Sequence, residues 1–150
     1  MKANYERIHI WHKVKKIMHI DEIAEKLTPM FKEKDLLLVL LFGSSVSGKI
    51  HKGSDIDLAF LSDTPVDILN ITNKVINLLH ANNIDLVDLS RASPLLKFSA
   101  AKNGKVLYEK RPGIFNEFYS LAFRMYVDTK KLRDARKTYI KNSLKKRGLV

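Results

Sequence analysis

The sequence of 150 residues contains no cysteine, which excludes disulfide bonds, zinc–thiolate sites and thiol nucleophiles. Any metal ion must therefore be held by oxygen or imidazole ligands. The sequence also lacks an apolar run of the length that a membrane-spanning helix needs, and its first 20 residues mix Lys, Arg and His among apolar positions. We expect a soluble, unprocessed, cytoplasmic protein with no membrane contact.

Acidic residues are scarce only at the two ends of the chain. The formal net charge is +11, yet residues 19–127 carry 13 basic and 13 acidic side chains. Residues 1–18 have five basic residues and one acidic residue, and residues 128–150 have nine and two. Basic ends on a balanced domain are typical of proteins that contact RNA or an acidic partner surface. A solvated, frayed helix end explains them equally well, and the sequence leaves both interpretations open.

The pattern of apolar residues predicts a mixed α/β protein. A hydrophobic content of 45% suits one domain with short appendages. The continuous apolar run at 36–42 is typical of a central strand that is buried on both faces. Start signals at Thr64-Pro65 and Ser93-Pro94 predict two helices, which should end near Asn82 and at Gly104. Further elements are predicted as a helix over 19–34 that Pro29 should bend or interrupt with a new turn, strands at 56–61, 84–89 and 106–109, and a long amphipathic helix over 115–132.

The chemically informative residues lie between the first two predicted strands. Gly43 follows the buried run and permits a tight turn with close backbone approach, and Ser44 places a hydroxyl at a predicted helix N-terminus. This corner could cradle a triphosphate. Asp55 and Asp57 are two residues apart on a strand, so their carboxylates point to one face with Cα atoms roughly 6.5 Å apart. Such a pair could share metal ions.

A third carboxylate is available on the next predicted strand. A period of two places Asp85, Val87 and Leu89 on one face and Asp88 on the other. Oxygen ligands on a rigid strand suit Mg²⁺, which completes its octahedron with water and phosphate oxygens. In a two-metal site Asp85 would be a ligand and a candidate general base. The alternative is that Gly-Ser forms an ordinary turn, and that Asp85 is a strand-edge carboxylate facing water.

Gly43-Ser44, ten intervening residues and Asp55-Ile56-Asp57 resemble the signature of the DNA polymerase β-like nucleotidyltransferase superfamily. Within that group, the short length, Gly53-Ser54 and the strand at 84–89 are similar to the minimal nucleotidyltransferases (MNT). The resemblance covers about residues 20–130. It implies the α/β fold of the superfamily, with a mixed twisted sheet flanked by helices and a long C-terminal helix.

The resemblance also implies a function. Minimal nucleotidyltransferases are typically encoded beside HEPN ribonuclease toxins and act as their antitoxins. The resemblance implies transfer of AMP from ATP to a tyrosine of such a toxin, so a hetero-oligomer with that toxin is expected. The resemblance assigns two Mg²⁺ ions and catalysis to Asp55, Asp57 and Asp85, with Ser44 as a further catalytic residue. The nucleotide-binding candidates are Gly43, Ser44, Ser54, Lys49 and Lys52. The two lysines would supply the charge that an arginine provides in many members, because Val46 and Ser47 follow the Gly-Ser pair here.

Three segments are expected, and two other functions remain open. The segments are a basic N-terminal extension over 1–18, the nucleotidyltransferase domain over 19–112 and a C-terminal helical segment over 113–150. One alternative is a transferase that acts on a small molecule such as an aminoglycoside, or on an RNA end. The small size argues against it, because such enzymes generally hold their acceptors with additional domains. The other is a noncatalytic module whose basic ends bind a toxin or RNA, and the complete set of carboxylates argues against that.

Overall fold

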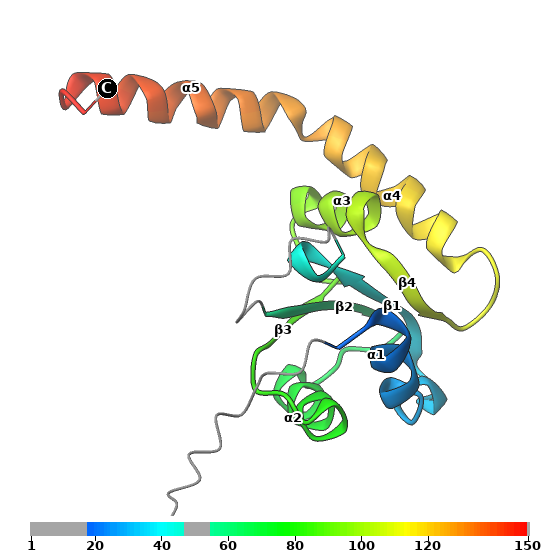
Figure 1. Cartoon of the computed structure of the whole chain (residues 1–150). Coiled ribbons are helices and arrows are strands. Elements are labelled where there is room, and N and C mark those ends of the chain that lie inside the picture. Colours follow the sequence, from blue (N-terminus) through cyan, green and yellow to red (C-terminus); the bar gives the residue numbers. More distant parts are fainter. Residues whose placement is uncertain (1–17, 47–54, 150) are drawn as a thin grey trace, which may run out of the picture.

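The computed structural model describes residues 18–46 and 55–149 (Figure 1). Its elements, in chain order, are α1 (Ile20–Leu27), η1 (Met30–Lys32), β1 (Leu36–Phe42), η2 (Gly43–Ser45), β2 (Ile56–Ser62), α2 (Ile68–Leu79), β3 (Ile84–Asp88), α3 (Pro94–Asn103), β4 (Lys105–Glu109), α4 (Ile114–Asp128) and α5 (Lys130–Lys146). This order confirms the mixed α/β class. The first helix ends before Pro29 and a separate 3-10 turn follows it, as expected for a proline at that position.

The four strands form one sheet in the order β3-β2-β1-β4. β1 pairs antiparallel with β2 and β4, whereas β2 and β3 are parallel. Every residue of β1 is apolar, because helices cover this inner strand on both faces. The predictions of an inner strand at 36–42 and an edge strand near 106–109 are therefore confirmed.

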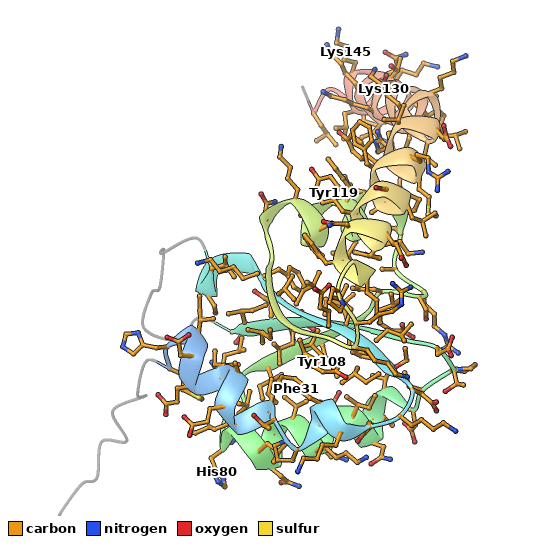
Figure 2. All side chains as sticks on the ribbon, turned by 90° about the vertical axis from the view of Figure 1, so that its right-hand side faces the viewer. Phe31, His80, Tyr108, Tyr119, Lys130 and Lys145 are labelled. Atoms are coloured by element: carbon orange, nitrogen blue, oxygen red, sulfur yellow. The ribbon has the colours of Figure 1, made fainter. Side chains whose placement is uncertain are left out.

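The helices form a layer on each face of the sheet (Figure 1). α1 and α2 pack on one face, where Ile23, Leu27 and Val75 are buried against strand residues. α3 and α4 pack on the other, where Ala100 and Phe118 are buried. At the rim of the first layer η1 contacts β4 through the stacked rings of Phe31 and Tyr108, with centroids 4.7 Å apart (Figure 2). Because successive side chains of a strand point to opposite faces of the sheet, neighbouring residues of β2 and β3 face different helix layers.

The two helix starts read from the sequence had different outcomes. The Ser93-Pro94 start is confirmed, because Ser93 Oγ accepts a hydrogen bond from the backbone N–H of Leu96 at 3.2 Å. The Thr64-Pro65 start is wrong. Asp67 caps α2 instead, and its carboxylate accepts hydrogen bonds from two first-turn N–H groups at 3.0 and 3.3 Å. α2 also ends earlier than Asn82, since His80 adopts the left-handed conformation directly after Leu79.

The predicted long C-terminal helix is present but divides at Thr129. Thr129 Oγ1 donates to the carbonyl oxygen of Met125 at 2.7 Å, and its backbone leaves the helical region. α4 contacts the sheet before this break, whereas α5 runs away from the domain after it (Figure 1). In the described part of the chain, no helix has both the length and the apolar content needed to cross a membrane.

Candidate functional site

The corner after β1 is built around a glycine. Gly43 has a φ of +75° and begins η2, a single 3-10 turn closed by a hydrogen bond from Val46 N–H to the Gly43 carbonyl at 3.3 Å. The sequence predicted a helix N-terminus here, and the observed turn is only three residues long. A Cβ atom on Gly43 would lie 1.9 Å from Oδ2 of Asp57. Only glycine therefore allows this carboxylate to lie against the turn.

Asp57 is the central member of a cluster of three aspartates, Asp55, Asp57 and Asp85. It lies opposite Phe42 of β1 and in register with Asp85 of the parallel strand β3. Asp55 precedes β2 by one residue, so the same alternation brings it to the face of the sheet that Asp57 and Asp85 share. Asp55 and Asp85 are exposed and Asp57 is half-buried. The structure thus brings together the three carboxylates that the sequence singled out.

The charges of the three aspartate side chains act on one another, and the effect is seen in the pKa of Asp57. Burial raises the pKa of the Asp57 carboxyl above its ordinary value, and the charges of Asp85 and Asp55 raise it further. The backbone N–H of Ser44 opposes the shift by donating a hydrogen bond to the carboxylate. Among the described residues, negative charge is thus concentrated at this end of the sheet, and a cation bound between the aspartates would relieve the repulsion.

The donor set fits Mg²⁺, whose ligands are hard oxygens. Among the residues at 18–46 and 55–149, no group of three His, Cys, Asp or Glu side chains forms a ready-made metal site. Mg²⁺ usually takes only one or two protein carboxylates and completes its shell with water and substrate phosphate oxygens. The arrangement of Asp55, Asp57 and Asp85 suits a site of that kind, in which the nucleotide supplies the remaining ligands.

The other aspartate of β3 has a structural role. Asp88 is only 7% exposed, and its Oδ1 accepts hydrogen bonds from the backbone N–H and hydroxyl of Ser90 at 2.8 and 2.6 Å. Its second oxygen lies 3.9 Å from Nε of Arg91. Asp88 therefore fixes the turn after β3, at the end of the strand away from Asp85. The different surroundings of the two aspartates, exposed at Asp85 and buried at Asp88, agree with the period-two prediction that they face opposite sides of β3.

Sequence reasoning missed one residue of the corner. Ser45 Oγ donates to the carbonyl oxygen of Asp55 at 3.2 Å, which ties η2 to the residue that precedes β2. The available signal was a second hydroxyl directly after Gly43-Ser44. Three further candidates, Ser54, Lys49 and Lys52, lie outside the described residues, and their nucleotide-binding roles stay predictions.

A cavity of about 740 Å³ lies away from the carboxylates. Its walls come from the start of β1, the end of β2 and the start of α4, which is the opposite end of the sheet from Gly43. Leu61, Leu89 and Phe118 are among its lining residues, and Arg111 and Glu117 form a bidentate ion pair at 2.9 Å beside them. None of the four catalytic candidates, Ser44, Asp55, Asp57 and Asp85, lines it, so cavity size does not locate the chemistry.

Residues 25–113 match the family described as polymerase beta, nucleotidyltransferase. That segment contains the Gly43 turn and all three carboxylates.

Individual relatives extend the similarity over most of the chain. The protein adenylyltransferase MntA of Aphanizomenon flos-aquae is 30% identical over an alignment of 147 positions that covers 89% of this chain and 98% of the relative. A crystal structure of a toxin-antitoxin with AMP-PNP superposes with a TM-score of 0.66 and 28% identity, over 85% of this chain and 99% of the other. A tri-AMPylated Shewanella oneidensis HEPN toxin in complex with its MNT antitoxin gives a TM-score of 0.63 and 25% identity, over 83% and 98%.

Proposed function

Because the chain belongs to the polymerase beta nucleotidyltransferase family, we propose that it is the antitoxin of a toxin–antitoxin pair and transfers AMP from ATP to a HEPN ribonuclease toxin. One observation carries the chemistry: Asp57 lies in register with Asp85 and against the Gly43 turn. The carboxylates therefore lie at the same end of the sheet as the turn that we propose binds phosphate. The similarity to a protein adenylyltransferase and to toxin–antitoxin complexes supports a protein acceptor.

Each residue of the site has a role in this proposal. The backbone turn at Gly43 and the Ser44 hydroxyl hold the triphosphate, because short turns present N–H groups to anions. Asp55, Asp57 and Asp85 would hold two Mg²⁺ ions, which when bound neutralise charge on the leaving pyrophosphate and make the acceptor hydroxyl more acidic.

The transfer itself is a displacement at phosphorus. A tyrosine oxygen of the toxin attacks the α-phosphorus of ATP, the bond from that phosphorus to the bridging oxygen breaks, and pyrophosphate leaves. Asp85 accepts the hydroxyl proton, since its carboxylate is exposed and adjacent to Asp57 on the neighbouring strand. The product is an AMP ester on the toxin, and no oxidant or reductant is needed.

The test is to incubate the purified chain with MgATP and the protein encoded beside it, followed by intact mass analysis. We expect the neighbour to gain one or more AMP units. Asp57→Asn should remove the gain while the protein stays folded. Asp63→Asn is the matched control, since it makes the same substitution just beyond the other end of β2 and should transfer AMP normally. A neighbour that stays unmodified in a stable complex with the wild-type chain would contradict the proposed reaction.

A further inference from the structure

Within the described part of the chain, the last helix packs hardly at all against the rest of the protein. α5 has 17 residues, all described, and none of them is buried. Each of the four α-helices that precede it in the described part of the chain has buried residues. Helices in proteins gain most of their stability from packing an apolar face, and an isolated helix of this length is marginal in water. A helix about 25 Å long with no buried side chain therefore indicates a surface that something else covers.

The chemistry of α5 combines charge with an apolar stripe. The helix carries eight basic residues and one acidic residue. Leu132 and Tyr139, seven positions apart and so on one face, are 72% and 75% exposed. Ala135 and Ser143 continue the same face between and beyond them. Side chains of α5, including Lys130 and Lys145, stand clear of the domain (Figure 2).

The direction of α5 is held by contacts at its first turn. Arg133 lies over the ring of Tyr126 at 3.9 Å from the centroid, and its Nη1 donates to Thr129 Oγ1 at 2.6 Å. Tyr126 in turn stacks on Phe98 of α3 with ring centroids 4.5 Å apart. This series of contacts connects α5 to the helix layer that covers the sheet. The helix is thus a directed arm rather than a frayed end.

The arm extends on the catalytic side of the molecule. Figure 1 shows α5 running out over the side on which η2 and the beginning of β2 lie. The carboxylates of Asp55 and Asp57 lie at that beginning of β2, and the 740 Å³ cavity lies at the other end of the sheet. A macromolecule bound along α5 would therefore stand on the side from which the acceptor must approach.

We propose that the face of α5 formed by Leu132, Ala135, Tyr139 and Ser143 is the docking surface for the acceptor protein. This inference rests on the proposed function, because the occupant is the protein that receives AMP. Its contact surface should have an apolar centre bordered by Asp and Glu, to match the exposed stripe and the eight basic residues of the helix. Two large apolar side chains at the centre of the surface favour a protein over RNA, whose phosphates would need only the cations.

The experiment compares two variants with the same change in net charge. Leu132→Glu combined with Tyr139→Glu alters the stripe, and Lys141→Glu, nine positions after Leu132, alters the opposite face. Each changes the net charge by two. Affinity for the neighbour-encoded protein is measured by calorimetry in full-length Asp57→Asn protein, where no transfer occurs. We expect the double variant to weaken binding at least tenfold and Lys141→Glu to stay within about twofold.

A second measurement uses the same changes in the active chain. The double variant should raise the KM for the acceptor protein, and leave the KM for ATP and the rate at saturating acceptor unchanged. Equal losses in both variants, unchanged binding in both, or a lower saturating rate with unchanged KM would each overturn the docking surface. Binding of a labelled RNA that only Lys141→Glu weakens, with acceptor affinity unchanged in both variants, would reassign the helix to RNA.

These measurements distinguish a failure of the docking surface on α5 from a failure of the proposed AMP transfer. If the wild-type chain transfers no AMP but forms a complex that the double variant disrupts, the docking surface stands and the proposed reaction fails. If the wild-type chain transfers AMP and the double variant binds normally, the reaction stands and the docking surface fails.

Discussion

Gly43 and Asp57 are in such close contact that a Cβ atom on the glycine would lie 1.9 Å from a carboxylate oxygen. We predict that Gly43→Ala displaces Asp57 and lowers AMP transfer by about 10²-fold, since a shift of about 1 Å at a reacting group has effects of that size. Alanine at a φ of +75° also costs roughly 1 kcal/mol of folding stability.

Gly113→Ala separates these two effects. Gly113 has a φ of +97°, and a Cβ atom there would meet nothing within 4 Å. This variant should lose similar stability in a denaturant titration and keep its transfer rate. Equal transfer by the two variants would show that the contact with Asp57 is not needed.

The raised pKa of Asp57 predicts a pH-dependent gain in stability for Asp57→Asn in Mg²⁺-free buffer. The folded protein disfavours the Asp57 anion, so ionisation of this group costs stability at neutral pH. Asparagine is never charged, and its oxygen can still accept the hydrogen bond from Ser44 N–H. The variant should therefore have the higher Tm at neutral pH. Its advantage should shrink as the pH falls through the raised pKa, and vanish below the ordinary value of 3.8.

Adding MgATP supplies the control, because only the wild-type chain should bind it tightly and gain stability from it. The order of the two Tm values should then reverse. A lower Tm for Asp57→Asn at neutral pH without ligand would mean that burial and repulsion do not dominate at this residue.

We predict that the same substitution at the two aspartates of β3 has opposite effects, on transfer at Asp85 and on stability at Asp88. Asp85→Asn should lower transfer by about 10²- to 10⁴-fold, the usual contribution of a general base, with little change in stability because the side chain is exposed. Asp88→Asn should cost about 1 kcal/mol, since it replaces charge-assisted hydrogen bonds to Ser90 with neutral ones. Thermal unfolding and steady-state transfer measured on both variants test this. Loss of transfer in Asp88→Asn at a temperature where it is folded would contradict the division of roles.

Much of this site could be predicted from the sequence because local rules determine it. A continuous apolar run identifies an inner strand. Alternation places Asp55 and Asp57 on one face of their strand, and Asp85 and Val87 on one face of theirs. The resemblance of Gly43-Ser44 and the aspartate pair to a known signature added the reaction. The register of Asp57 with Asp85 could not be predicted, since it depends on which strands pair and in which direction.

Three other features of the structure could not be predicted from the sequence pattern. The apolar spacing of three and four continues through Thr129, so the break between α4 and α5 has no signal in the pattern. Ser45 was missed because its partner, the carbonyl oxygen of Asp55, lies ten residues away in the sequence. The start of α2 was misplaced because two capping residues, Thr64 and Asp67, stand three positions apart and local preference does not choose between them.

The choice between Thr64 and Asp67 as the cap of α2 gives a final prediction on stability. Asp67→Ala should cost about 1 kcal/mol, because two first-turn N–H groups of α2 lose the carboxylate that accepts their hydrogen bonds. Thr64→Ala removes only an exposed hydrogen bond of 3.0 Å to Asp35, and its cost should stay below about 0.5 kcal/mol. Denaturant titrations of the two variants against the wild-type chain measure both values. A larger cost for Thr64→Ala would place the helix start at the threonine. α2 packs on the face of the sheet opposite the carboxylates. Both variants should therefore transfer AMP at the wild-type rate while they remain folded. That result would separate the stability of this helix layer from the chemistry at the Gly43 turn.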